Sequence, residues 1–99
     1  MLRADEVLEE MARTFRDRNG KYKDNWKNTG AVMLAFMPNG VTLLTEEDFV
    51  KFHLFEWVIG KLTRFVNTGM TDKGSVHDAA VYLAMIEAFI NEIGEPSGD

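Results

Sequence analysis

Residues 45–67, TEEDFVKFHLFEWVIGKLTRFVN, are the stretch that decides the fold. A threonine followed three residues later by an aspartate, ahead of an apolar run, is typical of a helix start. Thr45 is the expected N-cap, and the Asp48 carboxylate is expected to reach back to it. Large apolar side chains then cover most of the circumference rather than one face. Because a helix that is apolar all round is normally buried all round, we expect it to be central or covered by another subunit.

Three further helices are predicted from apolar residues at helical spacing. The first two cover residues 4–16 and about 24–37, with a polar loop broken at Gly20 between them and a Pro38–Gly40 turn after the second. Residues 41–44 form an extended connector in this interpretation, because a lone strand has no partner. The fourth helix is expected to start at Ser75, with Asp78 in the capping-box position.

These elements predict an all-α, four-helix bundle in one domain, residues 1–93, followed by a disordered tail, residues 94–99. The chain has 99 residues and no cysteine, so neither disulfides nor thiolate metal sites stabilise its small core. Association into a homo-oligomer, a dimer or a tetramer, is one way to enlarge such a core.

Composition also limits the partners. A net charge of −5 argues against a dedicated double-stranded DNA binder, which needs a basic face. No run approaches the roughly 18 apolar residues of a membrane span, and the charged start lacks an apolar signal region. We therefore expect a cytoplasmic protein without a membrane partner. Phosphate-loop, GxGxxG, HExxH and GxSxG motifs are absent, which excludes the enzyme classes that they mark.

The polar residues on the apolar helices are the first candidate site. Glu56, Gly60 and Arg64 share one helix face, and a carboxylate in such a helix must be paired, hydrated or coordinated. If the last two helices pack antiparallel, Glu56 approaches Asp78, and two facing carboxylates can hold a divalent cation such as Mg²⁺. Phosphate oxygens would then be neutralised by nearby cations, for which we expect Lys61, Arg64 and Lys73.

Structural roles remain open for the same residues. Asp78 can serve only as a helix cap, and Glu56 can form a salt bridge with Arg64 or Lys61. A second candidate is the basic segment 13–27, in which Tyr22 and Trp26 alternate with cations. It is either a solvated loop or a surface that holds phosphates and stacks a base, as single-stranded nucleic-acid binders do.

Short motifs along the chain resemble a known family. They are Arg18-x-x-x-Tyr22 with Asn25-Trp26, Leu44-Thr45-x-x-Asp48, Gly60-Lys61-x-x-Arg64-x-x-Asn67 and Asp78-x-x-x-Tyr82. Together, from Val7 to Phe89, they resemble short phage-encoded proteins of the MazG-like, all-α NTP pyrophosphatase type. The resemblance implies an oligomeric, nucleotide-binding helical fold in the host cytoplasm. In catalytic members, Mg²⁺ held by an ExxE and an ExxD motif activates a water that splits a triphosphate into monophosphate and pyrophosphate.

The chain departs from that catalytic pattern. Asp78 matches the final aspartate of ExxD, but Ser75 stands where the first acid belongs. The third helix has no ExxE and offers only Asp48 and Glu56. On this resemblance the expected metal ligands are Asp78, Glu56 and Asp48, and the expected phosphate or nucleotide ligands are Lys61, Arg64, Lys73, Tyr22 and Tyr82.

Two functions of different classes follow. The first is a nucleotide-binding protein, with Mg²⁺-dependent pyrophosphohydrolase activity if the site turns over. The second is a non-catalytic helical module that sequesters a nucleotide or inhibits a host protein. The missing carboxylates favour the second, and so does the aromatic surface of residues 45–67.

Overall fold

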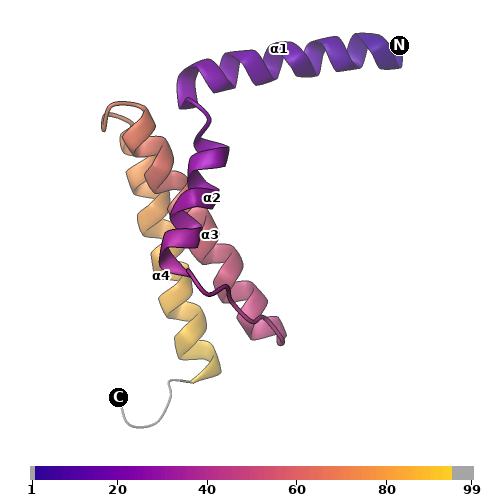
Figure 1. Ribbon diagram of the computed structural model, residues 1–99. Coiled ribbons are helices and arrows are strands. Elements are labelled where there is room, and N and C mark those ends of the chain that lie inside the picture. Colours follow the sequence, from indigo (N-terminus) through magenta and orange to yellow (C-terminus); the bar gives the residue numbers. More distant parts are fainter. Residues whose placement is uncertain (1, 95–99) are drawn as a thin grey trace.

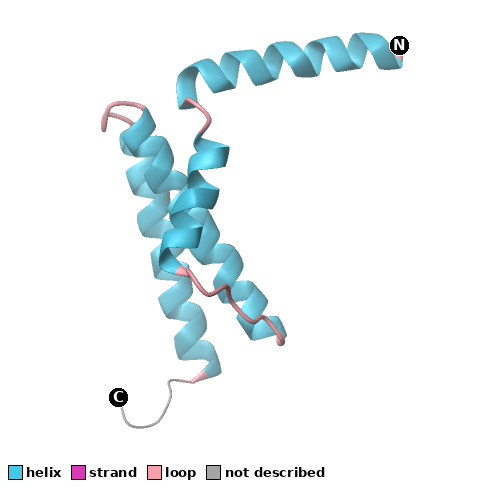
Figure 2. Cartoon of the chain, viewed as in Figure 1, coloured by secondary structure: helices cyan, strands magenta, loops and turns pink. Residues whose placement is uncertain are grey.

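The computed structural model describes residues 2–94, and residues 1 and 95–99 lie outside this part. Within it the chain forms four α-helices and no strand (Figures 1 and 2): α1 (Ala4–Tyr22), α2 (Asn25–Phe36), α3 (Glu46–Asn67) and α4 (Lys73–Ile93). The predicted all-α class is confirmed, and residues 41–44 form the expected connector without secondary structure. Most of the predicted tail, 94–99, falls outside the described residues.

The body of the molecule is an antiparallel pair, α3 and α4, with α2 lying against α3 (Figure 1). Its apolar core is small and consists of Leu54, Val58 and Ile59 from α3 and Ala79 from α4. A hydrogen bond of 2.9 Å joins the hydroxyls of Thr29 and Thr63 and ties α2 to α3. Thr63 is buried, and its hydroxyl also lies 2.9 Å from the Gly60 carbonyl oxygen, to which it donates, so it is satisfied within the chain.

Helix α3 is not covered all round within the single chain, so it is not the central helix that was one of the two expectations, and cover by another subunit stays a prediction. Four large side chains of α3 remain between 43% and 55% exposed: Phe49, Trp57, Leu62 and Val66. The reason is that α2 spans only 12 residues and covers one side of a 22-residue helix, while α4 covers another. A large part of the apolar surface of α3 therefore has no cover within residues 2–94.

Helix α1 differs from the prediction in both length and position. Gly20 does not break it, because an interior glycine costs a helix only about 1 kcal/mol. The helix runs on to Tyr22 and ends where Lys23 and Asp24 adopt φ values of 51° and 60°. From there it points away from the other three helices (Figure 1). The radius of gyration is accordingly 17.3 Å, against about 13 Å for a compact chain of this length.

The start of α3 is confirmed and the start of α4 is corrected. Thr45 Oγ1 accepts from the Asp48 amide at 3.1 Å, and Asp48 Oδ2 accepts from the Thr45 amide at 3.2 Å. Helix α4 begins at Lys73, two residues before the predicted cap, with Asp72 as its N-cap. Ser75 is instead buried in the first turn and donates from Oγ to Asp72 Oδ2 at 2.8 Å. Asp78 therefore lies too far into the helix to complete a capping box. Over residues 2–94, no helix is both long and apolar enough to span a membrane.

Candidate functional site

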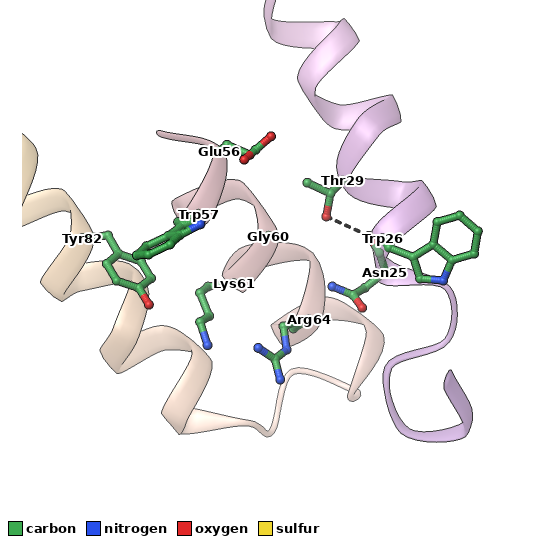
Figure 3. Close-up of a pocket in the computed structure, with 9 residues that line it drawn as sticks. All are labelled: Asn25, Trp26, Thr29, Glu56, Trp57, Gly60, Lys61, Arg64 and Tyr82. Atoms are coloured by element: carbon green, nitrogen blue, oxygen red, sulfur yellow. Dashed lines mark hydrogen bonds between the residues drawn. The ribbon is translucent and has the colours of Figure 1, made fainter. Parts of the chain in front are cut away.

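A pocket of about 390 Å³ opens where α2, α3 and α4 meet (Figure 3). Its size falls in the range of small-molecule sites. Helix α3 supplies one wall at helical spacing, since Glu56, Gly60 and Arg64 lie four residues apart and Trp57 and Lys61 form the adjacent row. The full lining consists of Asn25, Trp26, Thr29, Glu56, Trp57, Gly60, Lys61, Arg64 and Tyr82.

Gly60 keeps the middle of this wall open. A Cβ atom built at this position meets no atom within 4 Å, so packing within the chain does not require glycine here. An interior glycine nevertheless costs a helix about 1 kcal/mol relative to alanine. The space in front of Gly60 belongs to the pocket, and the absent side chain makes it available to a ligand.

Arg64 is the most unusual residue of the pocket. Its Nε atom is shielded from solvent and has no hydrogen-bond partner in the described part of the chain. None of the ion pairs found within residues 2–94 includes Arg64. Its guanidinium carbon lies 4.1 Å from the ring centroid of Tyr22, which covers one side of the cation. A partly desolvated cation without a counter-ion is unfavourable, and a bound anion would offset that cost.

The cations around Tyr22 also change its chemistry. The Arg64 guanidinium, followed by the Lys21 ammonium, favours the phenolate form and lowers the pKa of the Tyr22 hydroxyl below its ordinary value. The backbone next to Tyr22 is held in place from α3, because Asn67 Nδ2 donates to the carbonyl oxygens of Tyr22 and Lys23 at 3.0 and 3.4 Å. The end of α1 is thus attached to the same turn of α3 that carries Arg64.

Lys61, in contrast, has a counter-ion. Its Nζ lies 3.0 Å from Asp78 Oδ2 across the α3–α4 contact, and its side chain is 20% exposed. The alternative that Glu56 forms a salt bridge with Lys61 is therefore wrong, because Lys61 pairs with Asp78. Glu56 is exposed on the pocket wall and takes part in none of the ion pairs of residues 2–94. Its carboxylate is therefore free to accept hydrogen bonds from a ligand.

Two aromatic rings complete the pocket on the α4 side. The ring centroids of Trp57 and Tyr82 lie 5.0 Å apart with the rings tilted by 54°, and the His53 ring lies 4.2 Å from the Trp57 ring with a tilt of 59°. Trp57 is 43% exposed. Trp26, from the α2 side, is 57% exposed, and its indole N–H donates to Asn19 Oδ1 at 3.4 Å. The pocket thus combines exposed aromatic faces with a cation that lacks a counter-ion.

The three predicted metal ligands are not brought together. Asp48 Oδ2 accepts from the backbone amides of Leu44 and Thr45, which lower the pKa of Asp48, and it lies in the first turn of α3. Lys61, the partner of Asp78, is 13 residues further along the helix, or about 20 Å at the helical rise. In the described residues no three His, Asp or Glu side chains are grouped as a metal site would require. Within one chain, Asp48 therefore lies too far from Asp78 to share a metal ion with it, and the expected Mg²⁺ site stays a prediction.

The predicted phosphate and nucleotide ligands divide in a similar way. Lys61, Arg64 and Tyr82 line the pocket, and Tyr22 borders it through Arg64. Lys73 is separate, since it lines another cavity beyond the α3–α4 turn, with Phe65 and Met70.

Sequence reasoning assigned neither Thr29 nor Trp57 to a site, and it placed Asn25 and Trp26 only in a family motif and, for Trp26, in the separate basic segment 13–27. The available signal was the position of Trp57 one turn before Lys61, which places an aromatic ring and a cation on one face.

The chain was compared with family models, with curated proteins and with solved structures, and none of them matches.

Proposed function

We propose that this chain binds a phosphate-bearing nucleotide in the α2–α3–α4 pocket. The observation that carries the proposal is the position of Arg64, a partly buried cation without a counter-ion, in the same pocket as the Trp57–Tyr82 pair, of which Trp57 is exposed. Arginine matches the geometry of phosphate oxygens, and aromatic rings stack on any base. A nucleotide is the common small molecule that requires both.

The residues take distinct parts in this proposal. Arg64 binds the phosphate, and Lys61 adds a second positive charge that Asp78 already holds in place. Trp57 stacks on the base. Glu56 accepts hydrogen bonds from the sugar hydroxyls or from base N–H groups, and Gly60 leaves room for the sugar.

The pyrophosphohydrolase activity implied by the sequence resemblance is a separate proposal, and binding does not depend on it. Asp78 is the residue that distinguishes the two. As the counter-ion of Lys61, Asp78 neutralises a positive charge that would otherwise attract the phosphate. Asp78→Asn is therefore expected to preserve or strengthen nucleotide binding. As a metal ligand, it would be required, and the same substitution would weaken Mg²⁺-dependent binding.

Titration calorimetry with nucleoside mono-, di- and triphosphates, free nucleosides and inorganic pyrophosphate tests the binding proposal. Arg64→Gln is expected to weaken binding of nucleotide and pyrophosphate at least tenfold, which corresponds to about 1.4 kcal/mol, and to leave nucleosides unaffected. Trp57→Leu is expected to weaken the binding of nucleotides and nucleosides by about 1–3 kcal/mol and to leave the binding of pyrophosphate unaffected. Lys73→Gln is the matched control, because it removes an exposed cation outside the pocket.

Equal affinities in wild type and Arg64→Gln would contradict the proposal, as would the absence of any nucleotide binding. Pyrophosphate release with Mg²⁺ is followed in the same samples. Release from the wild type that is lost in Asp78→Asn would support the hydrolase. Binding without release would leave a nucleotide-sequestering protein.

A further inference from the structure

Helix α1 carries an apolar stripe that the rest of the described chain does not cover. Leu8, Met11 and Phe15 follow one another at spacings of three and four residues and are 65%, 59% and 53% exposed. No residue of α1 is buried. Such a stripe over a 19-residue helix is typical of a helix that packs against a partner.

The charges of α1 are divided between its two halves. Residues 3–12 contain Asp5, Glu6, Glu9 and Glu10 with one base, Arg3, whereas residues 13–22 contain Arg13, Arg16, Arg18 and Lys21 with one acid, Asp17. The two halves therefore have opposite net charges of similar size. Arg3 pairs with Asp5 and Glu6 at the helix start, at 3.3 and 3.2 Å. The ion pairs of residues 2–94 include none of Glu9, Glu10, Arg13 or Arg16.

We infer that α1 is a self-association surface whose partner is α1 of a second copy, packed antiparallel. The stripe is centred on Met11, so a two-fold arrangement places Leu8 against Phe15 of the other copy and Met11 against its counterpart. The same arrangement places the acidic half of each helix beside the basic half of the other. A parallel arrangement would place like charges together, which disfavours it.

The position of α1 leaves room for this pairing. The helix points away from α2, α3 and α4, which join it only at its carboxyl end (Figure 1). In an antiparallel pair the two bodies therefore lie at opposite ends and do not collide. The helix is about 28 Å long, and a two-helix contact of this length is at the small end of specific interfaces. The dimer is accordingly expected to dissociate on dilution, in the micromolar range.

Sedimentation velocity over a range of concentrations tests this inference with two charge-reversed chains. Glu9→Lys/Glu10→Lys gives both halves of α1 a positive net charge, and Arg13→Glu/Arg16→Glu gives both halves a negative net charge. Each alone is expected to associate at least tenfold more weakly than wild type, and an equimolar mixture is expected to regain the dimer. All four side chains are exposed, and circular dichroism verifies that each variant is folded.

The absence of natural cysteines allows a test of orientation. Leu8→Cys mixed with Phe15→Cys is expected to give a mixed disulfide-linked dimer on oxidation, in excess over either self-linked product. Self-linked products in excess would indicate a parallel pair and overturn the orientation. A wild type that stays monomeric at all concentrations would overturn the inference, because α1 would then fold back on its own chain or bind another protein. Undiminished association of both reversed chains would overturn it as well, because the contact would then lie on α2–α4.

Discussion

Helices α1 and α3 are of similar length and both have amphipathic or apolar sequences, but they differ in how much of their surface the rest of the chain buries. Helix α3 buries Leu54, Val58, Ile59 and Thr63, whereas α1 buries no residue. The difference lies in their neighbours, since α3 lies between α2 and α4, and α1 leaves the body at Lys23. An apolar stripe therefore predicts that a helix needs a partner, but it does not say whether that partner belongs to the same chain.

The largest difference between the two helices is expected in core truncations. Ile59→Ala removes a side chain that is 3% exposed and should lower the free energy of unfolding by about 2–5 kcal/mol. Met11→Ala, on the exposed stripe, should change the stability of the dilute chain by less than about 0.5 kcal/mol. Urea unfolding followed by circular dichroism measures both. Similar losses for the two variants would show that α1 packs on the body in solution.

The helix starts provide a second comparison. Thr45→Ala removes the hydroxyl that accepts from the Asp48 amide and should cost about 1 kcal/mol. At the start of α1, the Arg3 amide donates to Glu6 Oε1 at 3.3 Å, and this hydrogen bond lies on an exposed surface. Glu6→Ala, which removes that acceptor, should therefore have a smaller effect on the urea midpoint than Thr45→Ala. The reverse order would mean that α1 contributes to the cooperative unit.

Two interior glycines separate stability from ligand binding. Gly20 in α1 and Gly60 in α3 both have open space where a Cβ would be placed. Alanine at either position should stabilise its helix by up to about 1 kcal/mol, because it has the higher helix propensity. Only Gly60→Ala should also weaken nucleotide binding, since its methyl group enters the pocket. Unchanged affinity of Gly60→Ala would indicate that the ligand does not approach this turn of α3.

The smallest expected effect is that of pH. Backbone amides of Leu44 and Thr45 lower the pKa of Asp48, and the Ser75 hydroxyl lowers the pKa of Asp72. Because each folded-state pKa lies below the unfolded value of 3.8, these carboxylates stabilise the fold above that pH. The contribution is lost as the pH falls through the folded-state pKa. Between pH 7 and pH 3, the melting temperature of Asp48→Asn should fall less than that of the wild type. Identical pH profiles of the two proteins would contradict this prediction.

Local sequence signals predicted much of the fold. The features that they did not predict depend on contacts between helices. The Thr45–Asp48 capping box and the Pro38–Gly40 turn are short-range features, and the structure contains both where they were expected. The start of α4 was misplaced because Ser75 and Asp72 both have capping side chains, and the choice between them depends on the burial of Ser75. Gly20 was given too much weight as a helix breaker.

The candidate site was predicted in part. The shared face of Glu56, Gly60 and Arg64 follows from helical periodicity alone, and these residues do line one pocket. The pairing of Lys61 with Asp78 could not be predicted, because it depends on the register between α3 and α4. That register also separates Asp78 from Asp48. Periodicity likewise could not show that Trp57 and Trp26 lie at the surface, since it does not reveal which face is covered.

The most direct test of the nucleotide-binding pocket is nuclear magnetic resonance of its side-chain N–H groups during a nucleotide titration. The Arg64 Nε–H group is shielded from solvent, and the chain has two tryptophans, so the arginine and indole signals can be assigned with Arg64→Gln and Trp57→Phe. We predict that the Arg64 and Trp57 signals shift together with one dissociation constant, and that inorganic pyrophosphate shifts the Arg64 signal alone. Unchanged Arg64 and Trp57 signals at saturating nucleotide would contradict this prediction.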